Sequence, residues 1–340
     1  MRIKKEVRKI VASVLAFLMV VSLIPVNSLM TKANAASKTT FEGGKTVEDG
    51  TWKGWTWNVF GSSTDVTKAS ATDTGNGGVT LEVTGDKGKI NGSASDQGLN
   101  TFLYELDKSY DFTITAQAKI DTLATNEQAA FGLTIRDNVG THGNTTKLTA
   151  DKNNFAFVGG YGNKDNNADE TTNHGNAGYK TTKLKHTRLG KSPAVGGTYD
   201  LAIQKIGDSV KLYFDGEVAT ECSAADLITD DTMYVGLFAA RNAKITFNNV
   251  KLAYTQDSSS VKVTNVTAPK KTTYCAGNTY EDVDLTGFKA TVSVDGKERE
   301  ITAADCVVDM SSKPFSEVTE AGKLNLLYLG QVIEVPITVI

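Results

Sequence analysis

The chain is short of the residues that staple small secreted proteins or bind transition metals. Among its 340 residues are three cysteines, Cys222, Cys275 and Cys306, and three histidines. A fold held by disulfides has more cysteines, usually in an even number. A Cys275–Cys306 bridge and two separate buried thiols both stay open. The histidines are widely spaced with no cysteine pair nearby, which argues against a zinc site.

Helical periodicity of useful length is also missing, apart from one turn at Ala224–Ile228 opened by Ser223. Short segments with alternating apolar residues take its place, separated by Gly, Asn and Asp, and Asp215-Gly216 predicts a tight hairpin. The expected strands include Val79–Val83, Tyr110–Ile120, Ala129–Asp137, Asn154–Tyr161, Thr198–Ile206, Ser209–Phe214, Asp231–Arg241 and Lys244–Leu252. Without a βαβ rhythm, this pattern predicts an all-β fold, an antiparallel jelly-roll β-sandwich.

Residues 1–35 have the pattern of a secretory signal peptide. A basic start is followed by the apolar run Ile10–Ile24 and by the small-residue cleavage site Ala33-Asn34-Ala35. A membrane anchor is the alternative, but Ser13, Ser22 and Pro25 interrupt the run. We therefore expect a secreted, extracellular protein with no membrane insertion, and cell-surface association stays open.

The net charge of the chain without residues 1–35 limits the classes of partner that it can bind. Removing residues 1–35 takes away six basic residues and one acidic residue, which leaves 30 basic against 38 acidic. Nucleic acid and anionic lipid need a basic face, so neither is an expected partner. An acidic polysaccharide held by a few local arginines remains compatible with this balance.

The expected organisation has two domains. Residues 36–254 carry the sandwich pattern, and residues 255–260 read as a polar linker. Residues 261–340 form a second all-β unit, with hairpins at Asp295-Gly296 and Leu329-Gly330-Gln331. Because the chain ends with its last expected strand, we expect no C-terminal wall-sorting signal. Residues 162–197 exceed ordinary loop length, which signals function, disorder or an unrecognised hairpin.

The strand Ala129–Asp137 is the first candidate for a binding element. It buries Phe131, Leu133 and Ile135 on one face and carries Arg136 on the other. The plain alternative is an arginine at a strand end that is either solvated or paired with Asp137. Three tryptophans crowd into residues 52–57, where Trp57 suits either a sugar-stacking platform or the core, and we expect at least one of the three in the core.

Four segments, Ala130–Asp137, Phe155–Tyr161, Tyr234–Asn242 and Ile245–Leu252, together resemble a concanavalin A-like (laminin G/jelly-roll) domain. Such domains occur in secreted bacterial polysaccharide lyases and glycosidases, including pectate-degrading ones. The resemblance covers about residues 40–254. Residues Tyr274–Asn278 and Val283–Val292 resemble a bacterial immunoglobulin-like repeat, a module that usually serves as a spacer or stalk.

The first resemblance implies sugar binding on the concave sheet or its rim and a structural calcium elsewhere. The implied ligand residues, with Trp57 added, are Arg136, Asp137, Tyr161, Arg241 and Asn242. Strand parity sets Arg136 and Arg241 out of phase, so either a bulge lies near Ala239-Ala240 or one arginine faces away from the ligand. Calcium is expected from Glu42 with Asn248 or Asn249, and less so from the acidic loop 165–170.

Three functions remain open. The favoured one is a non-catalytic carbohydrate-binding protein for a pectic or other plant cell-wall glycan. The second is a polysaccharide lyase or glycoside hydrolase with a site around Arg136, His142 and Tyr161, although no spacing joins these residues and no Glu-x-Asp-x-Glu run occurs. The third is a structural cell-surface or adhesion module whose partners are other surface proteins.

Overall fold

The computed structural model describes residues 39–61, 65–90, 97–125, 128–145, 148, 153–164 and 171–340. The expected signal peptide and the acidic loop 165–170 lie outside these residues. Residues 39–340 form one compact unit. Within the described residues, none of the helices combines the length and apolar character needed to cross a membrane.

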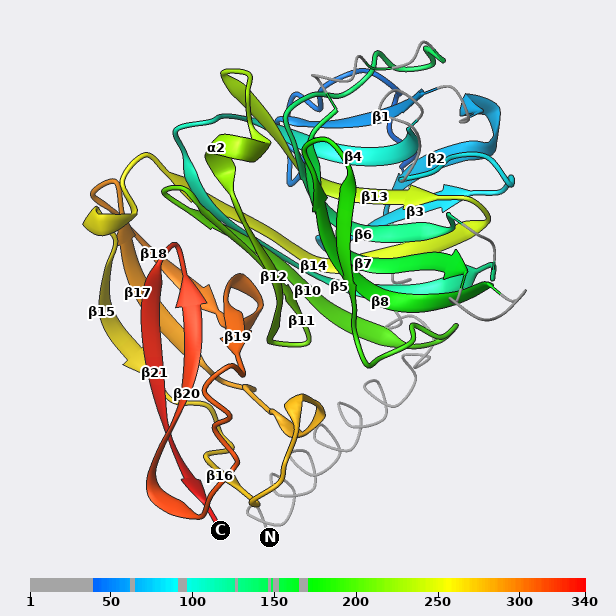
Figure 1. Cartoon of the computed structure of the whole chain (residues 1–340). Coiled ribbons are helices and arrows are strands. Elements are labelled where there is room, and N and C mark those ends of the chain that lie inside the picture. Colours follow the sequence, from blue (N-terminus) through cyan, green and yellow to red (C-terminus); the bar gives the residue numbers. More distant parts are fainter. Residues whose placement is uncertain are drawn as a thin grey trace, which may run out of the picture. The chain divides into compact units, whose positions relative to one another are not determined.

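Two seven-stranded antiparallel sheets form the larger sandwich (Figure 1). The first sheet runs in the order β1 (Trp55–Gly61), β4 (Gly98–Asp107), β13 (Thr232–Ala240), β6 (Ala130–Arg136), β7 (Phe155–Lys164), β8 (Thr171–Lys180), β9 (Leu184–Arg188). The second runs β12 (Glu217–Ser223), β11 (Ser209–Phe214), β10 (Thr198–Ile206), β5 (Asp111–Leu123), β14 (Ala243–Thr255), β3 (Val79–Val83), β2 (Ala69–Asp73). The chain crosses repeatedly between the sheets, which is the jelly-roll arrangement predicted from the sequence.

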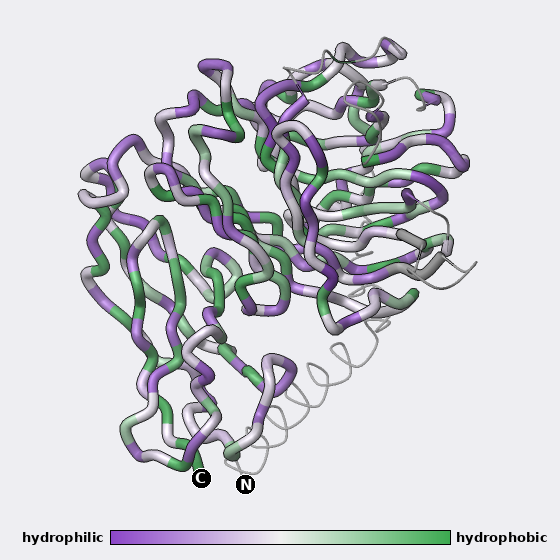
Figure 2. Tube along the Cα trace, viewed as in Figure 1, coloured by the Kyte–Doolittle hydropathy of each residue, from purple (hydrophilic) through white to green (hydrophobic). Residues whose placement is uncertain are grey.

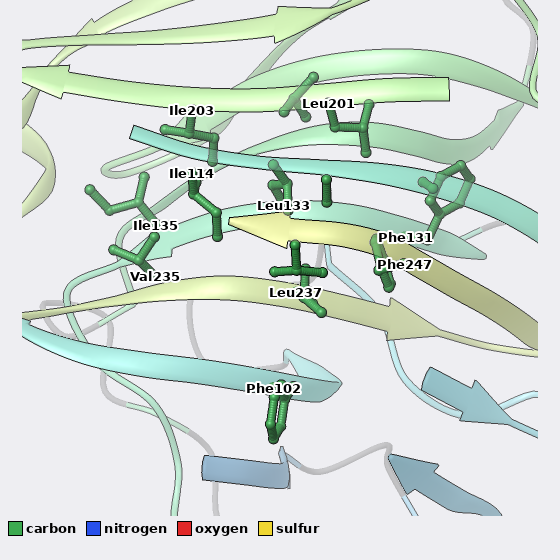
Figure 3. Close-up of a cluster of buried hydrophobic side chains, with 14 of the residues drawn as sticks. Phe102, Ile114, Phe131, Leu133, Ile135, Leu201, Ile203, Val235, Leu237 and Phe247 are labelled. Atoms are coloured by element: carbon green, nitrogen blue, oxygen red, sulfur yellow. The ribbon is translucent and has the colours of Figure 1, made fainter. Parts of the chain in front are cut away.

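The main core fills the space between these two sheets (Figure 3). Phe131, Leu133 and Ile135 of β6 meet Ile114 of β5 and Ile203 of β10, and all five are fully buried. Period-two alternation sets every second side chain of each strand into this layer. The opposite side chains of the first sheet therefore form a separate outer face, which carries the candidate site.

Local signals predicted the tight connections well. Asp215 and Gly216 both have positive φ between β11 and β12, as the predicted hairpin turn requires. Ser223 Oγ caps the short helix α2 (Ala224–Leu227) by accepting from the backbone N–H of Asp226. The only other helical turn of the larger sandwich among the described residues is η2 (Val66–Lys68).

The C-terminal residues form two small sheets around their own core. One has the order β15 (Lys262–Thr267), β17 (Lys289–Val294), β18 (Lys297–Thr302); the other is β16 (Thr273–Tyr274), β21 (Gln331–Val339), β20 (Thr319–Tyr328), β19 (Val307–Asp309). Short 3-10 turns connect them: η4 (Ser258–Ser260), η5 (Tyr280–Asp282) and η6 (Ala303–Asp305). A separate cluster of buried side chains links both sheets. The expected second all-β unit is therefore present, and its immunoglobulin-like type stays a prediction.

All three cysteines are free. Cys306 is buried, Cys222 is half-buried and Cys275 is exposed. Of the two alternatives for Cys275 and Cys306, the disulfide is thus absent, and only Cys306 is a buried thiol.

Candidate functional site

The outer face of the first sheet is divided between a second apolar cluster and a polar edge. The apolar part lies over β13, β6 and β7 and is built mainly from fully buried aromatic residues, namely Phe60, Phe155, Phe157, Tyr161 and Phe238. Figure 2 shows that the hairpin of β8 and β9 is largely hydrophilic by comparison. This hairpin, residues 171–188, occupies half of the segment 162–197 that the sequence left undecided.

Arg136 lies on this outer face, as parity predicts, but it is completely buried. Its Nε donates to the carbonyl of Asn138 at 3.2 Å, and its Nη2 donates to Gln97 Oε1 and, at 3.4 Å, to Asn153 Oδ1. The guanidinium carbon also sits 5.1 Å from the centre of the Phe155 ring. Arg136 therefore holds two loops over the sheet, and its burial leaves no exposed surface for an extended sugar chain.

Asp137 is buried as well, and burial raises its pKa to about 6 against the opposing effect of the Arg136 charge. Its Oδ1 accepts from the backbone N–H of Asn154 at 3.0 Å, and Oδ2 accepts from Thr229 Oγ1 at 3.2 Å. Burial likewise lowers the pKa of Arg136 to about 10, and the Asp137 charge acts in the opposite direction. The sequence alternative of a solvated arginine at a strand end is thus wrong.

The other residues implied by the resemblance do not gather around Arg136. Tyr234 pairs with Arg136 and Ala240 pairs with Ala130 without a register shift, so Arg241 follows the opposite end of β13. Six residues at strand spacing separate the two ends by about 20 Å. This placement explains the parity mismatch without a bulge.

Arg241 and Asn242 form the turn between β13 and β14. Both have positive φ, Arg241 Nε donates to the carbonyl of Gly88 at 2.7 Å, and the Asn242 N–H donates to the carbonyl of Gly85. Tyr161 pairs with Ala130, at the same far end of the sheet. The six predicted ligand residues therefore do not form one site.

Trp57 belongs to the main core, together with Trp52 and Trp55. Its Nε1 donates to Asn100 Oδ1 at 2.7 Å, and His142 packs edge-on against its ring at 5.1 Å. The ring is therefore not an exposed stacking platform. His142 accepts a hydrogen bond from the backbone N–H of Val59 through Nδ1, so this nitrogen already has a structural partner.

The structure instead assembles a group that we call the polar corner: Tyr161 on β7, Asn176 on β8, and His186 and Arg188 on β9. The rings of Tyr161 and His186 meet edge-on at 5.5 Å, and His186 Nδ1 lies 3.0 Å from Asn176 Oδ1. Asn176 is fully buried, whereas His186 and Arg188 are half-buried at the side of the sheet. His186 and Arg188 are therefore accessible from solvent, whereas the buried Asn176 holds the His186 ring in place.

Hydrogen bonding fixes the proton of His186. The Asn176 amide donates through Nδ2 to the carbonyls of Tyr161 and His174, at 3.4 and 3.1 Å. Because a carbonyl only accepts, Oδ1 must face His186, so Nδ1 of the imidazole carries the hydrogen. Nε2 is then the acceptor nitrogen. Burial, with a smaller effect of Arg188, lowers the pKa of His186, which favours the neutral ring at pH 7.

Asn176 and Arg188 are not identified from the sequence, because it leaves residues 162–197 open between a functional segment, disorder and an unrecognised hairpin. The usable signal was the period-two spacing of His174 with Asn176 and of His186 with Arg188, which places each pair on one face of a strand. Glycines and polar residues in both strands obscured that alternation.

The expected calcium ligands have other partners. Glu42 forms an exposed ion pair with Lys45, and Asn249 Nδ2 donates to Gln117 Oε1 at 2.8 Å. Across the ranges that the structure describes, three or more Asp, Glu, His or Cys side chains nowhere come close enough to hold a metal ion. Calcium binding by Glu42 and Asn249 stays a prediction.

Solved structures with a comparable fold share little sequence with this chain. Lectin II from Ulex europaeus is 9% identical, with 64% of this chain and 98% of the lectin covered and a TM-score of 0.37. Carbohydrate-binding module CBM66 from Bacillus subtilis is 14% identical, with 62% and 98% covered and a TM-score of 0.31. Alginate lyase AlyC3 is 13% identical, with 55% and 77% covered and a TM-score of 0.36.

Sequence comparison is more informative. Pectate lyase L of Thermoclostridium stercorarium is 30% identical over 258 residues, which are 75% of this chain and 19% of that protein. The chain thus spans about a fifth of the relative's length. The family model described as the pectate disaccharide-lyase N-terminal domain matches residues 58–257. With more than half of its length matched, the chain belongs to the pectate disaccharide-lyase N-terminal domain family.

Proposed function

We propose that the protein is a non-catalytic carbohydrate-binding protein that holds an acidic plant cell-wall polysaccharide, pectate first, at the polar corner. The observation that carries the proposal is the orientation of His186. Its Nε2 is an acceptor for a sugar hydroxyl because Asn176 fixes the proton on Nδ1. Arg188 on the same strand adds a donor suited to a carboxylate. Family membership supports pectate as the first polysaccharide to test.

Retardation in native gels containing polygalacturonate tests this proposal. We expect Arg188→Ala to weaken retention about tenfold, since a charge-assisted hydrogen bond to a carboxylate contributes about 1.5 kcal/mol. His186→Ala removes a bond between neutral groups, which contributes about 1 kcal/mol, so we expect retention to weaken about fivefold. Lys185→Ala is the matched control, because Lys185 lies on β9 but faces the opposite side, against Tyr179 at 5.5 Å. Equal retention of all variants and of the wild type would remove the polar corner from binding.

A second candidate is a polysaccharide lyase, and the same histidine favours it. A neutral imidazole with its acceptor nitrogen oriented by an amide has the form of a general base, and Arg188 would neutralise a uronate carboxylate. Incubation with polygalacturonate and alginate, followed by ultraviolet absorbance of unsaturated products, separates the two candidates. Turnover that is lost in His186→Ala establishes the lyase, and binding without turnover supports the binding protein.

A further inference from the structure

Two buried cations on the outer face of the first sheet each keep one nitrogen that has no hydrogen-bond partner among the described residues. Arg136 is fully buried and Lys180 is 3% exposed. Arg136 Nη1 and Lys180 Nζ are both unpaired, although the remaining nitrogens of Arg136 are well satisfied. Leaving a charged donor unpaired in an enclosed site carries a large free-energy cost.

The two side chains lie in one row of the sheet. Arg136 on β6 pairs with Phe155 on β7, and Phe155 pairs with Lys180 on β8, so all three side chains project from the same face. Two strand spacings separate the backbones of Arg136 and Lys180 by about 10 Å. Both side chains are long enough for their donors to converge on one atom group between them, and the Arg136 charge acts on Lys180.

Among the described residues no carboxylate forms a direct ion pair with Arg136 or Lys180, although the Asp137 charge acts on Arg136. Lys205, another buried lysine, lies 3.8 Å from Asp111 and donates to the carbonyl of Tyr110 at 2.9 Å. Asp137, the buried acid next to Arg136, directs its oxygens to Asn154 and Thr229 instead. Within the part of the chain that the structure describes, the row Arg136–Phe155–Lys180 therefore carries two positive charges and no paired negative one.

We propose that Arg136 and Lys180 form an internal anion site that takes one singly charged acceptor, a carboxylate or a halide, between Nη1 and Nζ. Such an ion receives one charge-assisted hydrogen bond from each cation and removes their mutual repulsion. The site stands on its geometry whether or not the protein binds polysaccharide. Because Arg136 has no exposed surface for an extended sugar chain, a uronate occupant is a monosaccharide acid or a chain end, and that choice of occupant rests on the proposed function.

Thermal unfolding of the full chain in a zwitterionic buffer tests the site. We expect sodium acetate or sodium chloride to raise the unfolding midpoint saturably, by about 5 °C at a hundredfold excess over the dissociation constant. Lys180→Met and Lys180→Gln should abolish the saturable rise, and Lys180→Met should already unfold at a higher temperature without anion. Lys205→Met is the matched control: it should lower the midpoint and keep the anion response.

A wild-type midpoint that shows no saturable response to any of these anions overturns the site, as does a response that survives in both Lys180 variants. The same measurement with galacturonate distinguishes a sugar carboxylate from a free small anion as the occupant. Saturation at lower concentration than acetate, with no effect of galactose, assigns the site to a sugar carboxylate, whereas equal responses assign it to free small anions. If the wild-type midpoint does not respond to anions but the protein is still retained by polygalacturonate gels, the anion site fails and the proposed function stands. If the midpoint responds but the gels do not retain the protein, the proposed function fails and the anion site stands.

Discussion

At the scale of single residues, strand position was predictable and exposure was not. Alternation placed Arg136 on the face opposite Phe131, which is confirmed. Its burial depends on Gln97, Asn138 and Asn153, which reach it from outside its strand. Sequence parity describes a sheet face but carries no information on which loops cover that face.

The buried carboxyl group of Asp137 predicts a pH dependence of stability. The folded protein holds the Asp137 proton more tightly than the unfolded chain does, because burial raises the pKa to about 6. This contribution to the free energy of unfolding is fully present below about pH 4 and is lost as pH rises through about 6. After allowance for screening, we expect a loss of about 2 kcal/mol, measured by urea unfolding from pH 4 to 7.

Asp137→Asn should flatten that part of the pH profile relative to the wild type. Asp231→Asn is the control, because Asp231 is exposed and pairs only with Lys108 at 2.9 Å. Parallel profiles for the wild type and Asp137→Asn would show that Asp137 titrates normally.

At the scale of elements, regular strands were predicted closely and irregular ones were missed. β10 and β11 have the predicted bounds, since their apolar residues alternate between turns rich in Gly and Asp. β8 was missed because Gly, Asn and Thr fill it, and its pairing is set by β7 and β9. A strand of this kind is specified by its neighbours, so its own sequence gives little signal.

Glycine at the centre of the first sheet is required by close backbone approach. Gly159 on β7 has φ of +155°, and a Cβ there would lie 2.0 Å from the carbonyl oxygen of Phe131 on β6. We expect Gly159→Ala to lower the free energy of unfolding by about 1–3 kcal/mol, measured by urea denaturation. Gly190→Ala has open space around its Cβ and should stay within about 0.5 kcal/mol of the wild type. Similar stability of both variants would contradict the close approach.

At the scale of the whole molecule, residues 39–340 form one compact unit that contains two separate hydrophobic cores, and the division into two domains joined by a polar linker stays a prediction. β14 runs through Tyr254 to Thr255, so the strand continues into the expected linker. Hydrogen bonds also join distant segments, including Thr115 Oγ1 to the carbonyl of Ala304 at 2.6 Å and Tyr280 OH to Asp200 Oδ2 at 2.9 Å. Side-chain pairs of this sequence separation leave no local pattern, so the sequence did not reveal them.

Tyr280→Phe tests how strongly those segments are coupled. The change leaves the Asp200 carboxylate without its phenol donor where burial already raises its pKa. We expect the free energy of unfolding to fall by about 1–3 kcal/mol, seen as a lower midpoint in calorimetry. Tyr199→Phe removes only an acceptor for the exposed N–H of Ala194 and should have a smaller effect. Equal midpoints for Tyr280→Phe and the wild type would show that the bond adds nothing.

Of the three cysteines, Cys275 is the one that is exposed for chemical labelling. Burial raises the pKa of Cys222 and of Cys306 to about 12, so neither forms a thiolate readily near neutral pH. Cys275 is exposed and lies outside the sheet that carries the polar corner. A maleimide support or fluorophore would therefore attach at a single position, and molecules anchored in this way would all present the first sheet to a polysaccharide in one orientation.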